Sequence, residues 1–274
     1  MDKYAVIGNP VTHSKSPPIH EAFARATGQN LTYARLEAPL DGFLPIVESF
    51  ARAGGKGLNV TAPFKLEAFA LAGAHSARAK LSGAVNTLKR EGDSWFDDNT
   101  DGPGIVRDFT HNLGIALAAR DILVLGAGGA ARGIMSSVLA EHPRSLTICN
   151  RTFAKAAAIA QLFAPYGPVA ATPPDALAGR TFDIVINATS AGLTDKSPPP
   201  WPARLLAAGG FAYDMIYAET PTAFLRWAEV NGAARTADGL GMLIEQAAES
   251  FFIWRGVRPD TAPIFPLLRP LRSS

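Results

Sequence analysis

The chain has 274 residues, of which 47% are hydrophobic and 18% charged, which is enough for two globular domains or one large one. The net charge at pH 7 is only +2 and the basic residues are scattered, so we expect no nucleic-acid-binding surface. The single cysteine, Cys149, excludes an internal disulfide, and no signal-peptide or membrane-spanning pattern is present, so we expect a cytoplasmic protein without a membrane or metal site.

Short apolar, β-rich runs alternate with helical patterns through the first half of the chain. Strands are expected at Tyr4–Ile7, Leu31–Leu36, Gly57–Val60 and Ala84–Leu88, and helices at Pro17–Thr27 and Asp41–Ala53. Gly28 and Gly54 suit helix ends. Such alternation predicts parallel sheets that helices cover on both faces.

The loop between the first strand and the first helix, Gly8–Pro17, is rich in hydroxyl and proline residues. Ser14 and Ser16 stand two residues apart, so in an extended segment both hydroxyls face the same side. Paired hydroxyls beside a helix N-terminus are suited to binding a carboxylate. The alternative is that Ser16 caps the helix before Pro17, which leaves Ser14 unexplained.

Further polar residues follow the next predicted strands. Asn59 and Thr61 lead into a helix whose first turn contains Lys65, an unfavourable place for a cation in the field of the helix dipole. Lys65 therefore has either a functional role or the ordinary role of a solvated lysine. Asn86 ends a strand, and Asp101 opens a helix, where an aspartate often serves as a cap. Converging hydroxyls, amides, a cation and a carboxylate suit a small polyhydroxylated acid.

A second series of strands and helices begins near Asp121. Strands are expected at Ile122–Leu125, Leu146–Cys149, Ile184–Ile186 and Phe211–Asp214, and helices at Phe153–Phe163 and Thr222–Asn231. A helix at about 104–112 is expected to bridge two domains, and the last long helix, 239–254, to pack back on the first. The Pro-rich stretch 197–202 is interpreted as a connector rather than a partner-binding motif.

These elements predict an α/β protein of two domains. The first is an α/β substrate-binding and catalytic domain at residues 1–103, completed by the C-terminal helical region 239–274. The second, at residues 104–238, is a Rossmann-type domain with a doubly wound parallel sheet.

A glycine-rich turn opens the second domain's first helix. Gly126, Ala127, Gly128, Gly129 and Ala130 directly follow the strand that begins near Asp121. Glycines here let the chain turn sharply and bring backbone N–H groups against a pyrophosphate, with the helix N-terminus adding partial positive charge. We interpret the turn as a dinucleotide site, the alternative being a purely structural turn.

The end of the next strand carries basic rather than acidic residues. NAD sites usually place Asp or Glu about 20 residues after the glycine turn, where it binds the ribose 2′-hydroxyl. Here Asn150, Arg151 and Thr152 end the strand and Lys155 follows one turn later, so a 2′-phosphate could be bound. We predict NADP rather than NAD, unless Arg151 and Lys155 only solvate a helix start. Thr189, in the loop after a later strand, is expected along the nicotinamide ribose or in a plain turn.

Nine motifs occur in order along nearly the whole chain. They are Gly8-Asn-Pro-x-x-His-Ser-Lys-Ser-Pro17, Gly55-Lys-Gly-x-Asn59-Val-Thr61-x-Pro-Phe-Lys65, Gly83-Ala-Val-Asn86-Thr87, Asp98-Asn-Thr-Asp101-Gly102, Gly126-Ala-Gly-Gly-Ala130, Asn150-Arg-Thr152, Asn187-Ala-Thr189-Ser190, Tyr213-Asp-Met215-x-Tyr217 and Ala237-Asp-Gly239-Leu-Gly-Met242. In this combination the chain closely resembles the shikimate dehydrogenase family.

The resemblance implies reversible reduction of 3-dehydroshikimate to shikimate with NADPH, a step towards aromatic amino acids. It implies that Ser14 and Ser16 hold the substrate carboxylate and that Lys65 and Asp101 form the catalytic pair. The ring hydroxyls would be bound by Asn59, Thr61, Asn86, Asp101 and Gln246.

The resemblance also assigns residues of the second domain. Tyr217 would close over the substrate, and Met215 and Gly239 would touch the nicotinamide. Lys65 would act as the acid and base, with Asp101 orienting it, in preference to a proton shuttle shared by both residues. The family further implies a homodimer, although monomers also occur in it.

Two residues depart from the family pattern. Ala77 stands where family members often carry an acidic residue near the cofactor, and Lys155 stands where many carry arginine. Lysine keeps the charge but loses the planar fork of arginine, which weakens the expected preference for NADP. The alternatives are a quinate/shikimate dehydrogenase with relaxed substrate or cofactor choice and a non-catalytic NADP-binding sensor.

Overall fold

The structure, a computed structural model, describes residues 1–189 and 200–269. The chain forms two compact units. Unit 1 comprises Met1–Gly104 and the described part of Leu243–Ser274, and unit 2 comprises Ile105–Met242. No helix within the described residues is both long enough and apolar enough to cross a membrane.

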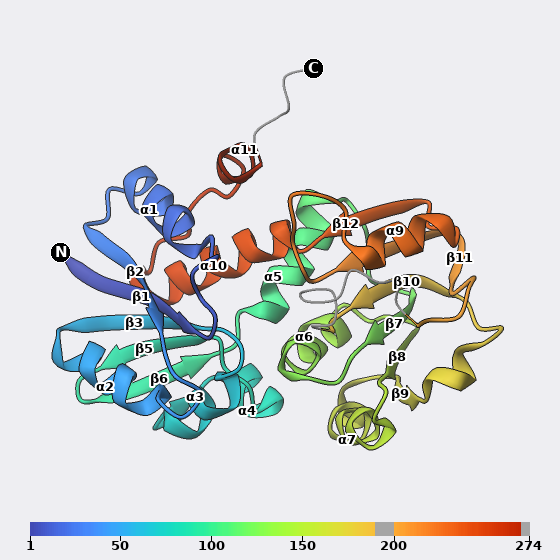
Figure 1. Ribbon diagram of the computed structural model, residues 1–274, viewed down its shortest axis with the longest axis horizontal. Coiled ribbons are helices and arrows are strands. Elements are labelled where there is room, and N and C mark those ends of the chain that lie inside the picture. The colour runs from blue at the N-terminus through green and yellow to red at the C-terminus, as the bar shows by residue number, and fades with distance from the viewer. Residues whose placement is uncertain (190–199, 270–274) are drawn as a thin grey trace. The chain divides into compact units, whose positions relative to one another are not determined.

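Unit 1 contains a six-stranded mixed sheet with the order β2-β1-β3-β5-β6-β4 (Figure 1). Its strands are β1 (Asp2–Gly8), β2 (Leu31–Glu37), β3 (Gly55–Val60), β4 (Ala74–His75), β5 (Thr87–Glu91) and β6 (Ser94–Asp98). β1 pairs in parallel with both β2 and β3, whereas β5 is antiparallel to β3 and to β6.

The expectation of a purely parallel sheet is therefore wrong for β5 and β6. A tight turn at Gly92 (φ 59°) joins these strands as a hairpin, and a hairpin needs no crossover helix. The strand expected at 84–88 begins only at Thr87 and continues to Glu91, so Asn86 lies in the loop before it.

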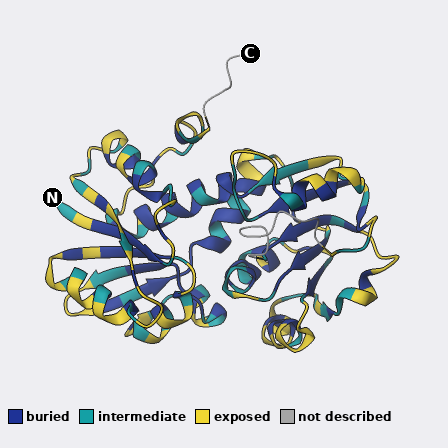
Figure 2. Cartoon of the chain, viewed as in Figure 1, coloured by how far each residue is buried: buried dark blue, intermediate teal, exposed yellow. Residues whose placement is uncertain are grey.

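Helices cover both faces of this sheet. The helices of unit 1 are α1 (Ser16–Ala26), α2 (Phe43–Arg52), α3 (Lys65–Leu71), α4 (Ala77–Ser82), α5 (Asp101–Arg107), α10 (Leu240–Arg255) and α11 (Ile264–Leu268), of which α5 and α10 extend into unit 2. Side chains of β1 alternate, because successive residues of a strand face opposite sides. Ile7 belongs to a core with Phe43 and Phe64, whereas Tyr4 stacks on Trp254 of α10. Helix α10 thus packs on unit 1 through Trp254, and Figure 2 shows most of this helix as buried.

Unit 2 contains a six-stranded sheet, parallel throughout, with the order β12-β11-β10-β7-β8-β9. Its strands are β7 (Asp121–Leu125), β8 (Ser145–Cys149), β9 (Val169–Thr172), β10 (Phe182–Asn187), β11 (Leu206–Asp214) and β12 (Arg235–Asp238). The strand order reverses between β7 and β10. In doubly wound sheets, ligands bind beyond the carboxyl ends of the strands at this reversal.

Helices of unit 2 follow the predicted pattern with one change. They are η1 (a π-helix, Asp108–Asn112), α6 (Gly129–Ala140), α7 (Phe153–Phe163), the 3-10 helices η2 (Ala164–Tyr166) and η3 (Pro174–Leu177), and α9 (Ala223–Val230). The helix expected at 104–112 is α5 followed by the π-turn of η1. Phe224 and Trp227 of α9 pack in a core with Leu123 and Val185 from the sheet.

Candidate active site

The predicted catalytic pair is in direct contact within unit 1. Lys65 is the first residue of α3 and Asp101 the first of α5, and Lys65 Nζ forms an ion pair with Asp101 Oδ2. Their side chains are 17% and 8% exposed, so water screens the pair only weakly. The other carboxylate oxygen, Asp101 Oδ1, accepts a hydrogen bond from Asn86 Nδ2 at 2.8 Å. Each oxygen of Asp101 therefore has its own partner, which fixes the carboxylate against the ammonium.

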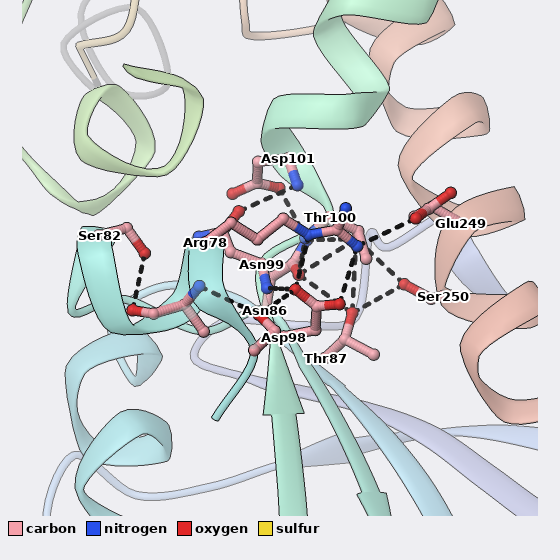
Figure 3. A network of polar contacts seen from close by, with 12 residues as sticks. Arg78, Ser82, Asn86, Thr87, Asp98, Asn99, Thr100, Asp101, Glu249 and Ser250 are labelled. Carbon is pink, nitrogen blue, oxygen red and sulfur yellow. Dashed lines mark hydrogen bonds and ion pairs between the residues drawn. The ribbon is translucent and has the colours of Figure 1, made fainter. Parts of the chain in front are cut away.

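A buried polar network surrounds Asn86 (Figure 3). Besides Asp101, Asn86 Nδ2 donates to Thr100 Oγ1 at 2.9 Å and, more weakly, to Gln246 Oε1 at 3.3 Å. Asn86 Oδ1 accepts from the backbone N–H of Thr100 at 2.8 Å and from Thr87 Oγ1 at 3.0 Å. The predicted residues Asn86, Asp101 and Gln246 thus lie together, although they come from three separate segments.

Asn59 belongs to the same network, with both ends of its amide bound to protein. Its Oδ1 accepts from the Tyr33 hydroxyl at 2.7 Å, and its Nδ2 donates to Ser250 Oγ at 2.9 Å and to the Asn86 carbonyl at 3.2 Å. Asn59 is only 5% exposed. In this arrangement Asn59 holds the backbone of Asn86, and its contact with ring hydroxyls, which the resemblance implies, stays a prediction.

Ser14 and Ser16 lie at the start of α1. Ser14 Oγ accepts the backbone N–H of Ser16 at 3.2 Å, and the Arg35 guanidinium donates to the Ser14 carbonyl at 2.6 and 3.1 Å. The N-cap residue of α1 is Lys15, without a side-chain cap bond, and Ser16 is already helical. The alternative that Ser16 caps this helix is therefore wrong, because Ser16 is the first residue of the helix and Lys15 occupies the cap position.

Thr61 lies over the end of β1. A Cβ on Gly8 would come within 2.3 Å of Thr61 Cγ2, so only glycine allows this approach. The backbone N–H of Thr61 donates to the Ile7 carbonyl at 2.9 Å, and the side chain is half-buried. Gly8 thereby brings the loop after β1 and the loop after β3 together on one side of unit 1.

The glycine-rich turn of unit 2 has the predicted strand–turn–helix form. Gly126 has φ +112°, and a Cβ there would be 3.0 Å from the Ala188 carbonyl oxygen, so both conformation and space require glycine. Gly128 is the N-cap of α6, which has no side-chain cap and no acidic residue in its first turn. Ala127, Gly129 and Ala130 complete the turn and are not buried. A helix start of this kind suits a phosphate group.

The basic cluster after β8 is open to solvent. Arg151, Thr152 and Lys155 are exposed at the start of α7, and Asn150 Nδ2 donates to the Thr152 carbonyl at 3.0 Å. This hydrogen bond holds the turn that presents the two cations. Two exposed cations and no carboxylate in this turn or in the first turn of α7 fit a 2′-phosphate.

The ends of β10 and β11 are tied together by buried polar groups. Asn187 Oδ1 accepts from Thr189 Oγ1 at 2.7 Å, and Asn187 Nδ2 donates to Asp214 Oδ1 at 3.0 Å. Burial raises the pKa of Asp214, while bonds from Thr222, the Ile216 N–H and Asn187 oppose that shift. The hydrogen bond to Asn187 holds the Thr189 side chain at the end of β10.

Met215 and Gly239 touch each other through the backbone. A Cβ on Gly239 would lie 2.3 Å from the Met215 carbonyl oxygen, so glycine is required for this contact. The Met215 N–H donates to the Asn187 carbonyl at 3.0 Å, which anchors the loop after β11. Tyr217 follows Met215 in the same loop and is half-buried. Ser190, the last residue of the predicted motif Asn187-Ala-Thr189-Ser190, lies outside the described residues.

Several network residues were not predicted as site residues. Thr87 and Thr100 directly adjoin Asn86 and Asp101 in sequence, and Ser250 follows Gln246 by four residues, which places both on one helix face. These sequence spacings could have predicted that the three residues belong to the site. No such spacing points to Tyr33, because its contact with Asn59 depends on how the strands pair. No group of three or more His, Cys, Asp or Glu side chains in the described parts of either unit is arranged to hold a metal ion.

Together, two features define a two-unit α/β protein of the dinucleotide-binding class. One is a doubly wound sheet with a glycine-rich helix start, and the other is a separate mixed-sheet unit whose helices α3 and α5 carry a part-buried Lys–Asp pair. Family models match most of the chain: the shikimate dehydrogenase substrate binding domain at residues 6–88, shikimate / quinate 5-dehydrogenase at 109–194 and the shikimate 5′-dehydrogenase C-terminal domain at 239–264. The chain belongs to the shikimate dehydrogenase family.

Individual relatives match over almost the full length. A shikimate dehydrogenase (NADP(+)) from Thioalkalivibrio sulfidiphilus is 56% identical, covering 99% of this chain and 100% of its own. The corresponding protein from Alkalilimnicola ehrlichii is 54% identical over 98% and 99% of the two chains. Among solved structures, shikimate 5-dehydrogenase from Thermus thermophilus in complex with NADP(H) and shikimate is 34% identical, covers 96% of each chain and has a TM-score of 0.85.

Proposed function

We propose that the chain is an NADP-dependent oxidoreductase that interconverts 3-dehydroshikimate and shikimate in the shikimate pathway. The observation that carries this proposal is the shielded Lys65–Asp101 ion pair at the edge of a buried amide and hydroxyl network, in a chain of this family. A further support is the relative from Thermus thermophilus, which was solved with both NADP(H) and shikimate.

Lys65 acts as the general acid in the reduction. NADPH, when bound, supplies the hydride, and the ketone oxygen then takes up negative charge. The Lys65 ammonium stabilises that charge and delivers a proton from Nζ, and in the reverse direction the neutral amine removes it. Assistance of this kind typically accelerates a reaction by about 10²–10⁴-fold. Asp101 keeps the ammonium in place through its ion pair, and Asn86 keeps Asp101 in place.

The NADP cofactor is assigned to unit 2 by the chemistry of the donors there. The uncapped start of α6 at Gly128 suits the pyrophosphate, and Arg151 with Lys155 suits the 2′-phosphate. Thr189, Met215 and Gly239 are proposed for the nicotinamide side because of the family resemblance. They follow β10, β11 and β12 respectively, and backbone contacts of Met215 with Asn187 and Gly239 link the three loops.

Substrate recognition is assigned to unit 1, with one residue from unit 2. We assign the carboxylate to Ser14 and Ser16, and the ring hydroxyls to the following side chains: Asn59, Thr61, Asn86, Asp101 and Gln246, of which Asn59 also holds the backbone of Asn86. Tyr217 of unit 2 is proposed to contact the substrate from the resemblance alone.

Steady-state assays with shikimate and quinate, each with NADP and with NAD, test the function and its rival. We expect the highest kcat/KM for shikimate with NADP. The quinate alternative has some basis, since the family model over residues 109–194 is named for both substrates. Comparable kcat/KM values for quinate, or for NAD, would support the relaxed enzyme instead, and no turnover with any pair would support the non-catalytic sensor.

Replacing Lys65 tests the role of the ammonium. Lys65→Ala should lower kcat by about 10²–10⁴-fold, with a much smaller change in the affinity for shikimate. Lys80→Ala is a matched control, because Lys80 is an exposed lysine of α4 in the same unit and should leave kcat near the wild-type value. If Lys65→Ala weakens shikimate binding as strongly as it lowers kcat, Lys65 only binds the substrate.

We further infer that the protein acts as a cytoplasmic homodimer. The family resemblance supports the dimer, and the lone, buried Cys149 is consistent with a reducing compartment. Analytical ultracentrifugation at micromolar concentration would give the mass of one or two chains directly.

A further inference from the structure

Arg78 of α4 takes no part in the proposed reaction, yet it is linked to Asp101 through a short series of hydrogen bonds. Its Nε and Nη2 donate to the two carboxylate oxygens of Asp98 at 2.6 and 2.8 Å, which is a two-pronged ion pair. Nη2 also donates to Glu249 Oε1 at 3.0 Å, on α10. Figure 3 shows the guanidinium between these carboxylates. Arg78 therefore ties α4, the end of β6 and α10 together.

Asp98 connects Arg78 to the turn that contains Asp101 through its own hydrogen bonds. Its carboxylate is only 8% exposed, and Oδ1 accepts from the Asn99 backbone N–H at 2.7 Å as well as from Ser76 Oγ at 2.6 Å. Asn99 in turn accepts the Asp101 backbone N–H on its Oδ1 at 3.0 Å. A continuous series of hydrogen bonds thus links Arg78, through Asp98 and Asn99, to the backbone N–H of Asp101.

Side chains hold three consecutive backbone N–H groups in this turn. The N–H groups of Asn99, Thr100 and Asp101 donate to Asp98, Asn86 and Asn99 respectively. These groups precede or begin α5, where no carbonyl of a preceding helical turn is available to accept them. The position of the Asp101 carboxylate therefore depends on side-chain acceptors, of which Asp98 is the one that the two-pronged ion pair with Arg78 holds in place.

We propose that Arg78 is a positioning residue, which holds the 98–101 turn so that the Asp101 carboxylate stays against Lys65 and Asn86. The proposal rests on the proposed function for its effect on turnover, although its effect on the turn does not. Without the guanidinium, the buried Asp98 carboxylate loses both prongs of its ion pair and turns towards water. Its hold on the Asn99 N–H then weakens. A displacement of about 1 Å in a catalytic group can cost about 10²-fold in rate.

Three variants test the proposal. Arg78→Met should lower kcat by about 10–100-fold with the KM for shikimate changed by less than about threefold, because the substrate's own contacts remain. Arg78→Lys restores the charge without the fork and should recover part of that loss. Arg258→Met is the matched control, since Arg258 is the other guanidinium on Glu249 and bonds to that residue rather than to Asp98; its kcat should stay within about twofold of wild type.

Amide hydrogen exchange reports the turn without relying on the reaction. Exchange at Asn99, Thr100 and Asp101 should become at least about tenfold faster in Arg78→Met than in wild type or Arg258→Met. Unchanged exchange in a folded Arg78→Met protein overturns the inference, and so does an equal loss of kcat in Arg258→Met. If Arg78→Met does not fold, Arg78→Lys is measured instead. Exchange rates and a kcat equal to those of the wild type in Arg78→Lys would also overturn the inference. Faster exchange in a protein that never turns over shikimate would refute the proposed function and leave the positioning role of Arg78 standing.

Discussion

His20 should make the protein lose stability in mild acid. It lies in α1, is 0% exposed, and its ring stacks on Tyr33 with centroids 4.3 Å apart. Neither ring nitrogen has a hydrogen-bond partner among the residues that the structure describes. Burial lowers the pKa of His20 from 6.5 to about 3, and the nearby Asn59 amide opposes this only in part. The folded protein therefore keeps this imidazole neutral.

The size of the effect follows from the difference between the two pKa values. Between pH 6.5 and 3 the unfolded chain binds a proton that the folded chain does not, so the free energy of unfolding falls as pH falls. At about 1.4 kcal/mol per pH unit, the roughly 1.5 units between pH 6.5 and pH 5 correspond to about 2 kcal/mol. This contribution is fully present above pH 6.5 and is lost progressively towards pH 3.

Urea unfolding of wild type and His20→Phe, followed by tryptophan fluorescence, measures the effect. Between pH 7 and pH 5 the wild type should lose about 2 kcal/mol more of its unfolding free energy than the variant. Ile19→Val is the control, since Ile19 is equally buried in the same helix and does not titrate. It should cost about 0.5–1.5 kcal/mol at both pH values. Equal acid losses in wild type and His20→Phe would refute the argument.

Three further substitutions probe other parts of the chain. Gly239→Ala should cost about 1–3 kcal/mol in urea unfolding, because its Cβ would lie 2.3 Å from the Met215 carbonyl oxygen; an unchanged midpoint would contradict that contact. Arg151→Ala should raise the KM for NADP by about 10–100-fold and leave that for NAD unchanged, whereas equal effects would exclude a 2′-phosphate contact. Burial raises the pKa of Asp97 from 3.8 to about 6, so the folded state loses stability as pH rises from 3.8 through 6. Asp97→Asn should therefore gain about 1–3 kcal/mol over wild type between pH 4 and pH 8, and parallel pH profiles would refute this.

The local pattern of the sequence was enough for many elements. The helix Phe153–Phe163 begins and ends where its periodicity predicted, and the glycine-rich turn sits between β7 and α6 as its motif required. Lys65 and Asp101 were also recognisable, one from an unfavourable place at a helix start and both from the family motifs. Such signals are local, because they depend on residues a few positions apart.

Tertiary structure alone decided how distant segments meet. The hairpin of β5 and β6 was missed because alternation of strands and helices does not specify the direction of strand pairing. Asn59 pairs with Tyr33 and Ser250, 26 and 191 residues away, and no local pattern of the sequence indicates these partners. The burial of His20 between α1, β2 and α10 is likewise invisible in the sequence. The sequence by itself determined which chemical groups are present and on which elements they stand. Packing determined which of them lose water, and burial is what sets their partners and their pKa values.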